Sequence, residues 1–388
     1  MKNQRPLKFS IVTPSLNQRP YIQETMESVL SQEGDFELEY FVIDGGSSDG
    51  SVERIRQCAE KVSSGNRPAR CRGITMEWIS EKDHGQSEAI NKGLRRATGD
   101  FVGYLNSDDL YFPGALARAA EAFADHPETD FIHGDGIFID ENSQMKWAWQ
   151  SRPYDYRLLS TFDFLYNRFT NFIVQQATFW RKAVLAKIGL LDESFHFAMD
   201  VEYWVRAGHH GLTFHYLPVP LGKHRYIPGI KTLSSSTVFW EDYMEIFRRY
   251  RGAEPLDRYF AHYYYSLALE SGFDLEQVRR EGLSLFDRWK DLPSSELRLL
   301  QEQSKRGFNL NRLLSARILN VHQRKPEARR LFMQALREKP RLLFSPYALP
   351  YLLSSLIGDS RTLALEKWTK ALLKPGKRRG STSTCVSA

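Results

Sequence analysis

Two adjacent carboxylates after a short apolar run constrain this chain more than any other feature. Residues 101–105 read as a buried strand, and Asp108 and Asp109 follow shortly after it. Pro113 then suits the first turn of a helix over 115–123. Because open α/β sheets bind ligands at the carboxyl ends of their strands, and Mg²⁺-like ions take carboxylates plus substrate phosphates, the pattern favours a metal–diphosphate site. The alternative is that one aspartate only caps the following helix.

Strand-like and helix-like segments alternate on both sides of this run. The expected strands cover residues 9–13, 40–43, 74–80, 131–140 and 213–218. The expected helices cover residues 21–31, a segment from 51, a segment ending near 98 before Gly99, and 182–189. This alternation predicts βαβ units around a parallel sheet. No G-x-G-x-x-G follows the first strand, which argues against an NAD or FAD enzyme.

The length and the composition predict more than one domain. The chain has 388 residues, of which 42% are hydrophobic, as in an ordinary globular protein. From about residue 236 glycine and β-branched residues become sparse, whereas Leu, Arg, Glu and Tyr dominate. We therefore expect an α/β domain over 1–235, a helical region over 236–375, and a disordered basic and Ser/Thr-containing tail over 376–388. Residues 328–336 resemble one helix of a tetratricopeptide-like pair, without a sustained repeat.

The cysteines and the charge narrow the class of protein further. Cys58, Cys71 and Cys385 are widely spaced and form no CxxC, so we expect neither a disulfide framework nor a zinc site, and a reducing cytoplasm fits best. We expect no secretory signal, since residues 1–8 are polar, and no membrane-spanning helix. The net charge of +6 comes without a nucleic-acid-binding signature, so we expect no nucleic-acid partner.

One segment near the C-terminus leaves contact with a membrane open. Residues 342–357 are apolar but interrupted by prolines, and the basic residues 374–379 follow. Such a pair of segments suits the surface of an anionic membrane. A buried helical hairpin followed by a disordered tail explains the same pattern equally well.

Other polar residues stand where a ligand would meet the sheet. Asp44 begins a glycine-rich loop over 45–50, which lets the backbone approach a ligand closely. Residues 147–178 combine aromatic side chains with Asn and Gln, a mixture that suits a sugar acceptor as well as an ordinary core. Asp200 lies in the first turn of a helix, where its carboxylate can point into a cleft. Residues 221–232 read as a flexible basic loop.

Four segments occur in order at suitable spacing: 11–17, 41–51, 83–93 and 105–109. Together they resemble family-2 glycosyltransferases of the GT-A fold, and the chain is similar to bacterial enzymes that build exopolysaccharide, O-antigen or capsule. The match covers roughly residues 8–235. The resemblance implies a Rossmann-like, mostly parallel α/β sheet flanked by helices, here with an all-helical C-terminal appendage.

The resemblance also implies ligands and their binding residues. The donor would be a nucleotide-diphosphate sugar, with a UDP-sugar favoured, and the acceptor a glycan or a lipid-linked molecule. By motif position Asp44 binds the base, Asp83 lies near the ribose or the phosphates, and Asp108, with Asp109 beside it, binds Mn²⁺ or Mg²⁺. The first acidic position of the motif is an asparagine here, which can still accept through its oxygen. The expected nucleotide-sugar contacts are Thr13, Pro14, Asn17, Asp44, Ser47, Asp83, Gln86, Asn91 and Asn106.

The resemblance assigns the general base to Asp200, with Glu202 as the second candidate. In relatives a basic loop can close over the donor diphosphate, and Arg225 falls near this loop. Relatives often carry a histidine shortly after the arginine, whereas here His224 precedes it, so the role of this loop stays open. A single base and a direct attack predict inversion of the anomeric configuration, and the acidic pair predicts that a metal assists. The expected reaction is therefore metal-dependent, inverting transfer of a sugar to a hydroxyl group. The expected location is the cytoplasm, with peripheral contact at the inner face of the plasma membrane as an option.

Two other functions remain open at this point. A sugar nucleotidyltransferase would share the nucleotide-binding sheet and the acidic metal site, but residues 14–20 provide no glycine-rich, basic phosphate loop. A catalytically degenerate transferase domain could act as a scaffold. This option stays open because Asn106 replaces the first acidic residue of the motif. Release of a nucleoside diphosphate, instead of pyrophosphate, distinguishes glycosyl transfer from nucleotidyl transfer.

Overall fold

The computed structural model describes residues 5–160, 173–227, 236–250, 255–344, 348 and 352. The chain divides into two compact units, residues 1–254 and 255–388. Helix α10 (Ser236–Tyr250) belongs to the first unit, although the predicted domain division falls before it. That division stays a prediction, and the predicted tail over 376–388 lies outside the described residues, as do the basic residues 374–379.

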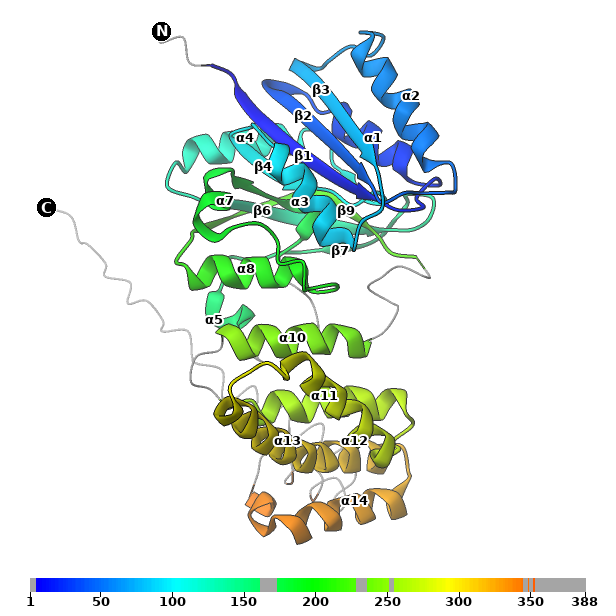
Figure 1. The fold of residues 1–388 in the computed structure, drawn as a ribbon, viewed down its shortest axis with the longest axis vertical. Coiled ribbons are helices and arrows are strands. Elements are labelled where there is room, and N and C mark those ends of the chain that lie inside the picture. The colour runs from blue at the N-terminus through cyan, green and yellow to red at the C-terminus, as the bar shows by residue number, and fades with distance from the viewer. Residues whose placement is uncertain are drawn as a thin grey trace, which may run out of the picture. The chain divides into compact units, whose positions relative to one another are not determined.

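A sheet of nine strands forms the centre of the first unit (Figure 1). Its order is β3-β2-β1-β4-β8-β6-β9-β5, and β7 pairs with β6. The pairings give β1, β2, β3, β4, β6 and β9 one common direction, so the predicted mostly parallel α/β sheet is confirmed. The strands are β1 (Leu7–Ser15), β2 (Gly34–Asp44), β3 (Cys71–Ser80), β4 (Phe101–Tyr104), β5 (Leu110–Tyr111), β6 (Phe131–Ile139), β7 (Met145–Trp149), β8 (Thr178–Arg181) and β9 (Phe214–Arg225).

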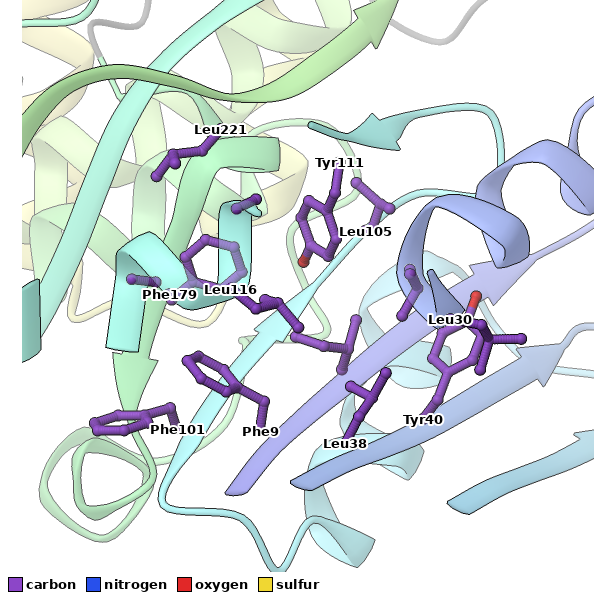
Figure 2. Close-up of a cluster of buried hydrophobic side chains, with 14 of the residues drawn as sticks. Phe9, Leu30, Leu38, Tyr40, Phe101, Leu105, Tyr111, Leu116, Phe179 and Leu221 are labelled. Carbon is purple, nitrogen blue, oxygen red and sulfur yellow. The ribbon is translucent and has the colours of Figure 1, made fainter. Parts of the chain in front are cut away.

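Helices cover both faces of this sheet, because alternate residues of a strand point to opposite sides. Phe9 and Ile11 of β1 join the apolar cluster that α1, α2 and α4 form on one face, part of which Figure 2 shows. Val12 points to the other face, toward α3. The helices of this unit are α1 (Ile22–Leu30), α2 (Ser51–Ser63), α3 (Gln86–Arg96), α4 (Ala115–Asp125), α5 (Tyr156–Leu159), α7 (Ala183–Ile188), α8 (Met199–His209) and α10, with a 3₁₀ turn η1 (Gln175–Ala177).

Helix α3 lies so close to β1 that only glycine fits at the contact. A Cβ atom on Gly93 would lie 2.5 Å from Cγ1 of Val12, well inside van der Waals contact. The absence of a side chain at Gly93 therefore sets the distance between this helix and the sheet. That distance matters for the site, because the first turn of α3 lines it.

Two local expectations are wrong. Residues 221–225 are the end of β9, which pairs with β6 and β5, so this part of the predicted basic loop is regular strand. The remainder, residues 228–235, lies outside the described residues. Gly99 does not end helix α3, whose last residue is Arg96; instead its backbone N–H donates to Oγ of Ser10, 2.9 Å away.

The second unit is helical, as the composition predicts. Its elements are α11 (Asp257–Glu270), α12 (Leu275–Ser284), η2 (Leu285–Trp289), α13 (Ser294–Val321), α14 (Lys325–Glu338) and η3 (Pro340–Phe344). Helices α13 and α14 share an apolar cluster of their own, separate from the core of the first unit. Within the part of the chain that the structure describes, no helix is both long enough and apolar enough to cross a bilayer.

Candidate active site

A pocket of about 1090 Å³ opens in the first unit at the carboxyl ends of β1 and β4. This is the edge of a parallel sheet where ligands bind, as the sequence predicts. The structure brings the following expected site residues to its wall: Pro14, Asn17, Asp83, Gln86, Asn106, Asp108 and Asp200. They come from separate loops and helices, so the fold gathers them from distant parts of the sequence.

The other expected residues do not line this pocket. Thr13, Asp44, Asn91 and Asp109 are buried, and Ser47 lies in the loop after Asp44. Asn91 donates to the backbone oxygen of Leu191, 2.9 Å away, and accepts from the backbone nitrogen of the same residue at 3.1 Å. It therefore joins helix α3 to the segment before α8. Such residues support the wall without forming it.

Asp44 holds together the loops that follow β1 and β2. Its Oδ2 accepts hydrogen bonds from the backbone nitrogens of Gly46 and Ser47 and from Oγ of Ser80. Oγ of Ser47 in turn accepts from the backbone nitrogen of Asn17, 2.7 Å away. Asn17 has a left-handed backbone, with φ of 51°, a conformation that asparagine tolerates better than most residues. The Asp44 carboxylate thus fixes the position of Asn17 at the pocket wall.

Asp108 and Asp109 point into different surroundings. Asp109 is fully buried, and its two carboxylate oxygens accept from the backbone nitrogen of Arg225 at 2.8 Å and from Nε2 of Gln176 at 2.7 Å. Asp108 is half-buried and lines the pocket. Burial, and then the neighbouring carboxylate of Asp109, raise the pKa of Asp108 to about 7. Positive charge in the pocket would relieve both effects, because it stabilises the ionised carboxylate.

Asn106 connects this acidic turn to helix α3. Its Oδ1 accepts from Nε2 of Gln86 at 2.6 Å, and its Nδ2 donates to Oδ2 of Asp109 at 3.2 Å. An aspartate here would place a second charge beside the buried carboxylate of Asp109. The asparagine therefore fits the local charge, even though it departs from the acidic pattern.

The sequence singled out Arg225 and His224 but did not reveal their role at the acidic turn. Arg225 is fully buried and does not line the pocket; its Nε donates to the backbone oxygen of Asp108 at 2.8 Å, and its Nη2 pairs with Glu24 at 2.8 Å. Arg225 thus positions the turn, whereas the resemblance placed it near a loop over the diphosphate. His224 does line the pocket. Burial, the largest effect, would lower its pKa, but the carboxylates of Asp109, 3.2 Å from Nδ1, and of Asp108 and Asp200 together outweigh burial and raise it.

Asp200 lies in the first turn of α8 and is half-buried at the pocket wall. Its Oδ1 accepts from the backbone nitrogen of Val201 at 2.8 Å. The second candidate, Glu202, does not reach the pocket: it is 1% exposed, pairs with Arg206 at 2.9 Å and accepts from the Tyr250 hydroxyl at 2.7 Å. Geometry therefore favours Asp200 as the carboxylate that can meet a substrate.

The remaining wall is amide and aromatic. Gln175 and Gln176 lie in the stretch where the sequence already suggested amide donors and aromatic walls. Nε2 of Gln175 donates to the backbone oxygen of Tyr104 at 2.7 Å, which fixes η1 against the end of β4. Phe239 and Tyr243 of α10 also line the pocket, although the sequence pattern assigned this helix to the appendage. No local signal in α10 distinguishes these aromatic residues from core residues.

The donor set fits a hard divalent cation only in part. Among the described residues there is no cluster of three or more His, Cys, Asp and Glu side chains that could hold a metal ion. The pocket nevertheless offers the Asp108 carboxylate beside the Asn106 amide. Mg²⁺-like ions are usually bound by one or two carboxylates together with substrate phosphates, so a single carboxylate suffices when the substrate brings the other ligands.

Comparison with known proteins agrees with this geometry. The model of the family "Glycosyl transferase family 2" matches residues 10–188. An uncharacterized glycosyltransferase of Mycobacterium tuberculosis is 30% identical over 199 residues, which cover 51% of this chain and 68% of the relative. A PGL/p-HBAD biosynthesis glycosyltransferase of Mycobacterium bovis is 27% identical over 240 residues, 61% of this chain and 82% of the relative.

Solved structures resemble the chain more distantly. S. aureus TarS has a TM-score of 0.48 at 18% identity, and the match covers 85% of this chain and 54% of that one, so the chain spans about half of its length. A mannosyltransferase from Pyrobaculum calidifontis, solved with GDP-Man and Mn²⁺, has a TM-score of 0.43 at 16% identity, covering 95% of this chain and 89% of that one. The family match and the Mycobacterium relatives decide the assignment: this chain belongs to glycosyltransferase family 2.

Proposed function

We propose that the protein transfers a sugar from a nucleotide-diphosphate donor to a hydroxyl group of a glycan or lipid-linked acceptor, with inversion at the anomeric carbon. One observation carries the proposal: Asp108 and Asp200, far apart in the sequence, line the same pocket. One carboxylate is suited to the charge of a diphosphate–metal complex, and the other to taking a proton. The donor favoured first is a UDP-sugar, as the sequence motifs imply.

The donor would lie along the β1–β4 half of the sheet. Pro14, Asn17 and Asp83 line this side, and Asp44 fixes the loop that carries Asn17. Asp108 would hold Mn²⁺ or Mg²⁺ together with the donor phosphates, while Asp109 and Arg225 keep its turn in place. When bound, the cation would offset the negative charge that gathers on the leaving nucleoside diphosphate.

Asp200 would act as the general base. Its carboxylate takes the proton of the acceptor hydroxyl as the oxygen attacks the anomeric carbon of the donor sugar. The new bond joins that carbon to the acceptor oxygen, and the bond to the diphosphate oxygen breaks, so the electron pair leaves with the nucleoside diphosphate. A direct attack from the face opposite the leaving group inverts the anomeric configuration. The proposed location is the cytoplasm, where nucleotide sugars are present.

Asp200→Asn tests this assignment. We expect the rate of transfer to fall about 10²- to 10⁴-fold, the usual worth of general base catalysis, with UDP affinity unchanged by calorimetry. A screen of UDP-, GDP- and TDP-sugars with Mn²⁺ supplies the donor, and proton NMR of the product gives its anomeric configuration.

Asp125→Asn is the matched control, because Asp125 is an exposed residue at the end of α4 that is not part of the pocket wall. It should transfer like the wild type. Full activity of Asp200→Asn would remove Asp200 from the mechanism. Release of pyrophosphate instead of a nucleoside diphosphate would favour a sugar nucleotidyltransferase, the second candidate that the sequence left open.

A further inference from the structure

Four aromatic side chains form one continuous side of the pocket. This aromatic wall consists of Phe138 on β6, Trp147 and Trp149 on β7, and Tyr226 just after β9. Phe138 stacks on Trp149 with ring centroids 4.7 Å apart and planes 9° from parallel. Trp147 meets Tyr226 at 5.2 Å in an edge-on arrangement. The rings thus support one another as a preformed surface.

The aromatic wall is open where a core would be closed. Trp147 is 42% exposed although it belongs to a cluster of large apolar rings. Strand β7 pairs only with β6 and lies at an edge of the sheet, so no further strand covers it within the described residues. Trp147 is thus exposed beside a pocket and in contact with half-buried rings, the kind of apolar patch that marks a binding surface.

The polar surroundings of the aromatic wall indicate what it binds. Nζ of Lys146 lies 5.5 Å from the Trp147 ring centroid, and the His224 ring meets Phe138 edge-on at 5.3 Å. A lipid chain would need continuous apolar surface without these groups. A pyranose ring has an apolar face of slightly positive C–H bonds, which the negative faces of aromatic rings attract, and a rim of hydroxyl groups, which polar neighbours can bind.

The aromatic wall comes from other elements than the proposed donor residues. The proposed donor residues belong to β1 and to the loops after β1 and β3, whereas β6 and β9 lie beyond β4 and β8 in the sheet. Asp108 comes from the turn after β4, which lies between these two halves in the strand order. The aromatic wall and the proposed donor residues are therefore different parts of the pocket lining, and the wall is left for a second ligand.

We propose that the aromatic wall is the acceptor subsite and that it binds a pyranose ring of the acceptor by stacking on Trp147. The assignment rests on the proposed function and adds the chemical class of the acceptor: the group next to the attacked hydroxyl is a sugar, whatever the sugar is attached to.

Saturation-transfer difference NMR with soluble methyl glycosides tests the subsite directly. The probes are the methyl glycosides of glucose, galactose, mannose, rhamnose and N-acetylglucosamine, each with the full-length protein in saturating UDP and Mn²⁺. We expect at least one glycoside to receive saturation, mainly at the ring protons of one face. Trp147→Ala should weaken that glycoside about 3- to 10-fold, and Trp147→Phe should retain most of the binding.

Met145→Ala is the matched control, because Met145 is an apolar residue on the same strand, 60% exposed, that does not line the pocket. It should bind the glycoside like the wild type, and all three variants should bind UDP with unchanged affinity. The proposal is overturned if no glycoside receives saturation from the wild type, or if Trp147→Ala weakens UDP as much as the glycoside. Glycoside binding that depends on Trp147, in a protein that hydrolyses no nucleotide sugar, would overturn the proposed function alone.

Discussion

Asp108 and Asp109 show how neighbours in sequence acquire different roles through their surroundings. Asp109 is buried, and its oxygens are occupied by hydrogen bonds from within the protein, so it serves the architecture of the turn. Asp108 faces the pocket, and its pKa is raised to about 7 by burial and by its neighbour. Because both effects disfavour the ionised form of Asp108, a cation in the pocket would stabilise it. In the proposed function the pair would therefore serve as one ligand and one support.

His133 gives a prediction for the effect of pH on stability. It lies on β6, fully buried, and burial, with a smaller effect of His215, lowers its pKa to about 3. In the unfolded chain His133 binds a proton near pH 6.5, so its protonation favours unfolding. The contribution of His133 to the free energy of unfolding is complete above that pH and is lost as the pH falls. Between pH 7 and 5 we expect this residue alone to remove about 1–2 kcal/mol from the free energy of unfolding.

Urea denaturation of wild type and His133→Gln at pH 7 and pH 5 measures this contribution. Glutamine is neutral at both values, so the variant should lose less stability than the wild type over the same interval. Because His133 contacts Oγ of Ser151 at 3.1 Å, the variant will also differ at pH 7, and only the change between the two pH values is compared. Parallel losses in the two proteins would show that His133 is protonated in the folded state.

At this scale the sequence predicts which residues gather but not which way they point. The order of the motifs places Asp108 and Asp200 at one edge of the sheet, and both line the pocket. The burial of Asp109 depends on Gln176 and Arg225, far along the chain, whose contacts no local pattern reveals. For the same reason Glu202, two residues after Asp200, could be separated from it only when the structure showed its pairing with Arg206.

Among the elements, α10 departs most from what the sequence indicates. Its composition resembles that of the helical region, yet it contributes Phe239 and Tyr243 to the pocket. Its Asp242 is buried and accepts hydrogen bonds from the backbone nitrogens of Phe197 and Ala198, at 2.8 and 3.0 Å. These nitrogens precede the first turn of α8, so α10 fixes the start of the helix that carries Asp200. The strands could be predicted from their local patterns. The packing partners of α10 could not, because they lie far away in the sequence.

Asp242→Ala should therefore impair catalysis more than donor binding. Without the carboxylate, two backbone nitrogens lose their acceptor and the start of α8 can shift. Because small displacements of a catalytic group are costly, we expect transfer to fall about 10- to 100-fold. UDP affinity should stay within about two-fold, since the donor side belongs to other elements. Steady-state kinetics with separate kcat and KM, together with calorimetry for UDP, distinguish these effects.

Asp242→Asn is the informative companion variant, because its amide oxygen can still accept from the same nitrogens. It should recover most of the rate. If the two variants lose activity equally, the negative charge of Asp242 matters instead of its geometry, and if neither loses activity, α10 does not position Asp200.

At the scale of the whole molecule, each compact unit has its own apolar core. The first is organised around the sheet, and the second has the cluster of α13 and α14 to which Leu331, Phe332 and Ala335 belong. The composition change near residue 236 predicted a helical second part. The boundary between the two units lies after α10, however, because α10 belongs to the first unit by its contacts although its composition resembles that of the second. Separate cores imply that the two units can be destabilised separately.

Leu331→Ala tests this separation, because the side chain is 5% exposed within the second cluster. Removing it should cost the second unit about 2–5 kcal/mol through lost burial and the cavity left behind. Scanning calorimetry should show one transition that moves down in the variant, and another that moves up with UDP, since a ligand stabilises only the unit that binds it. Leu299→Ala, at a leucine that is 49% exposed, should move neither transition appreciably. A single transition that responds to both Leu331→Ala and UDP would mean that the two cores unfold together. The helical unit would then contribute to the stability of the unit that contains the pocket.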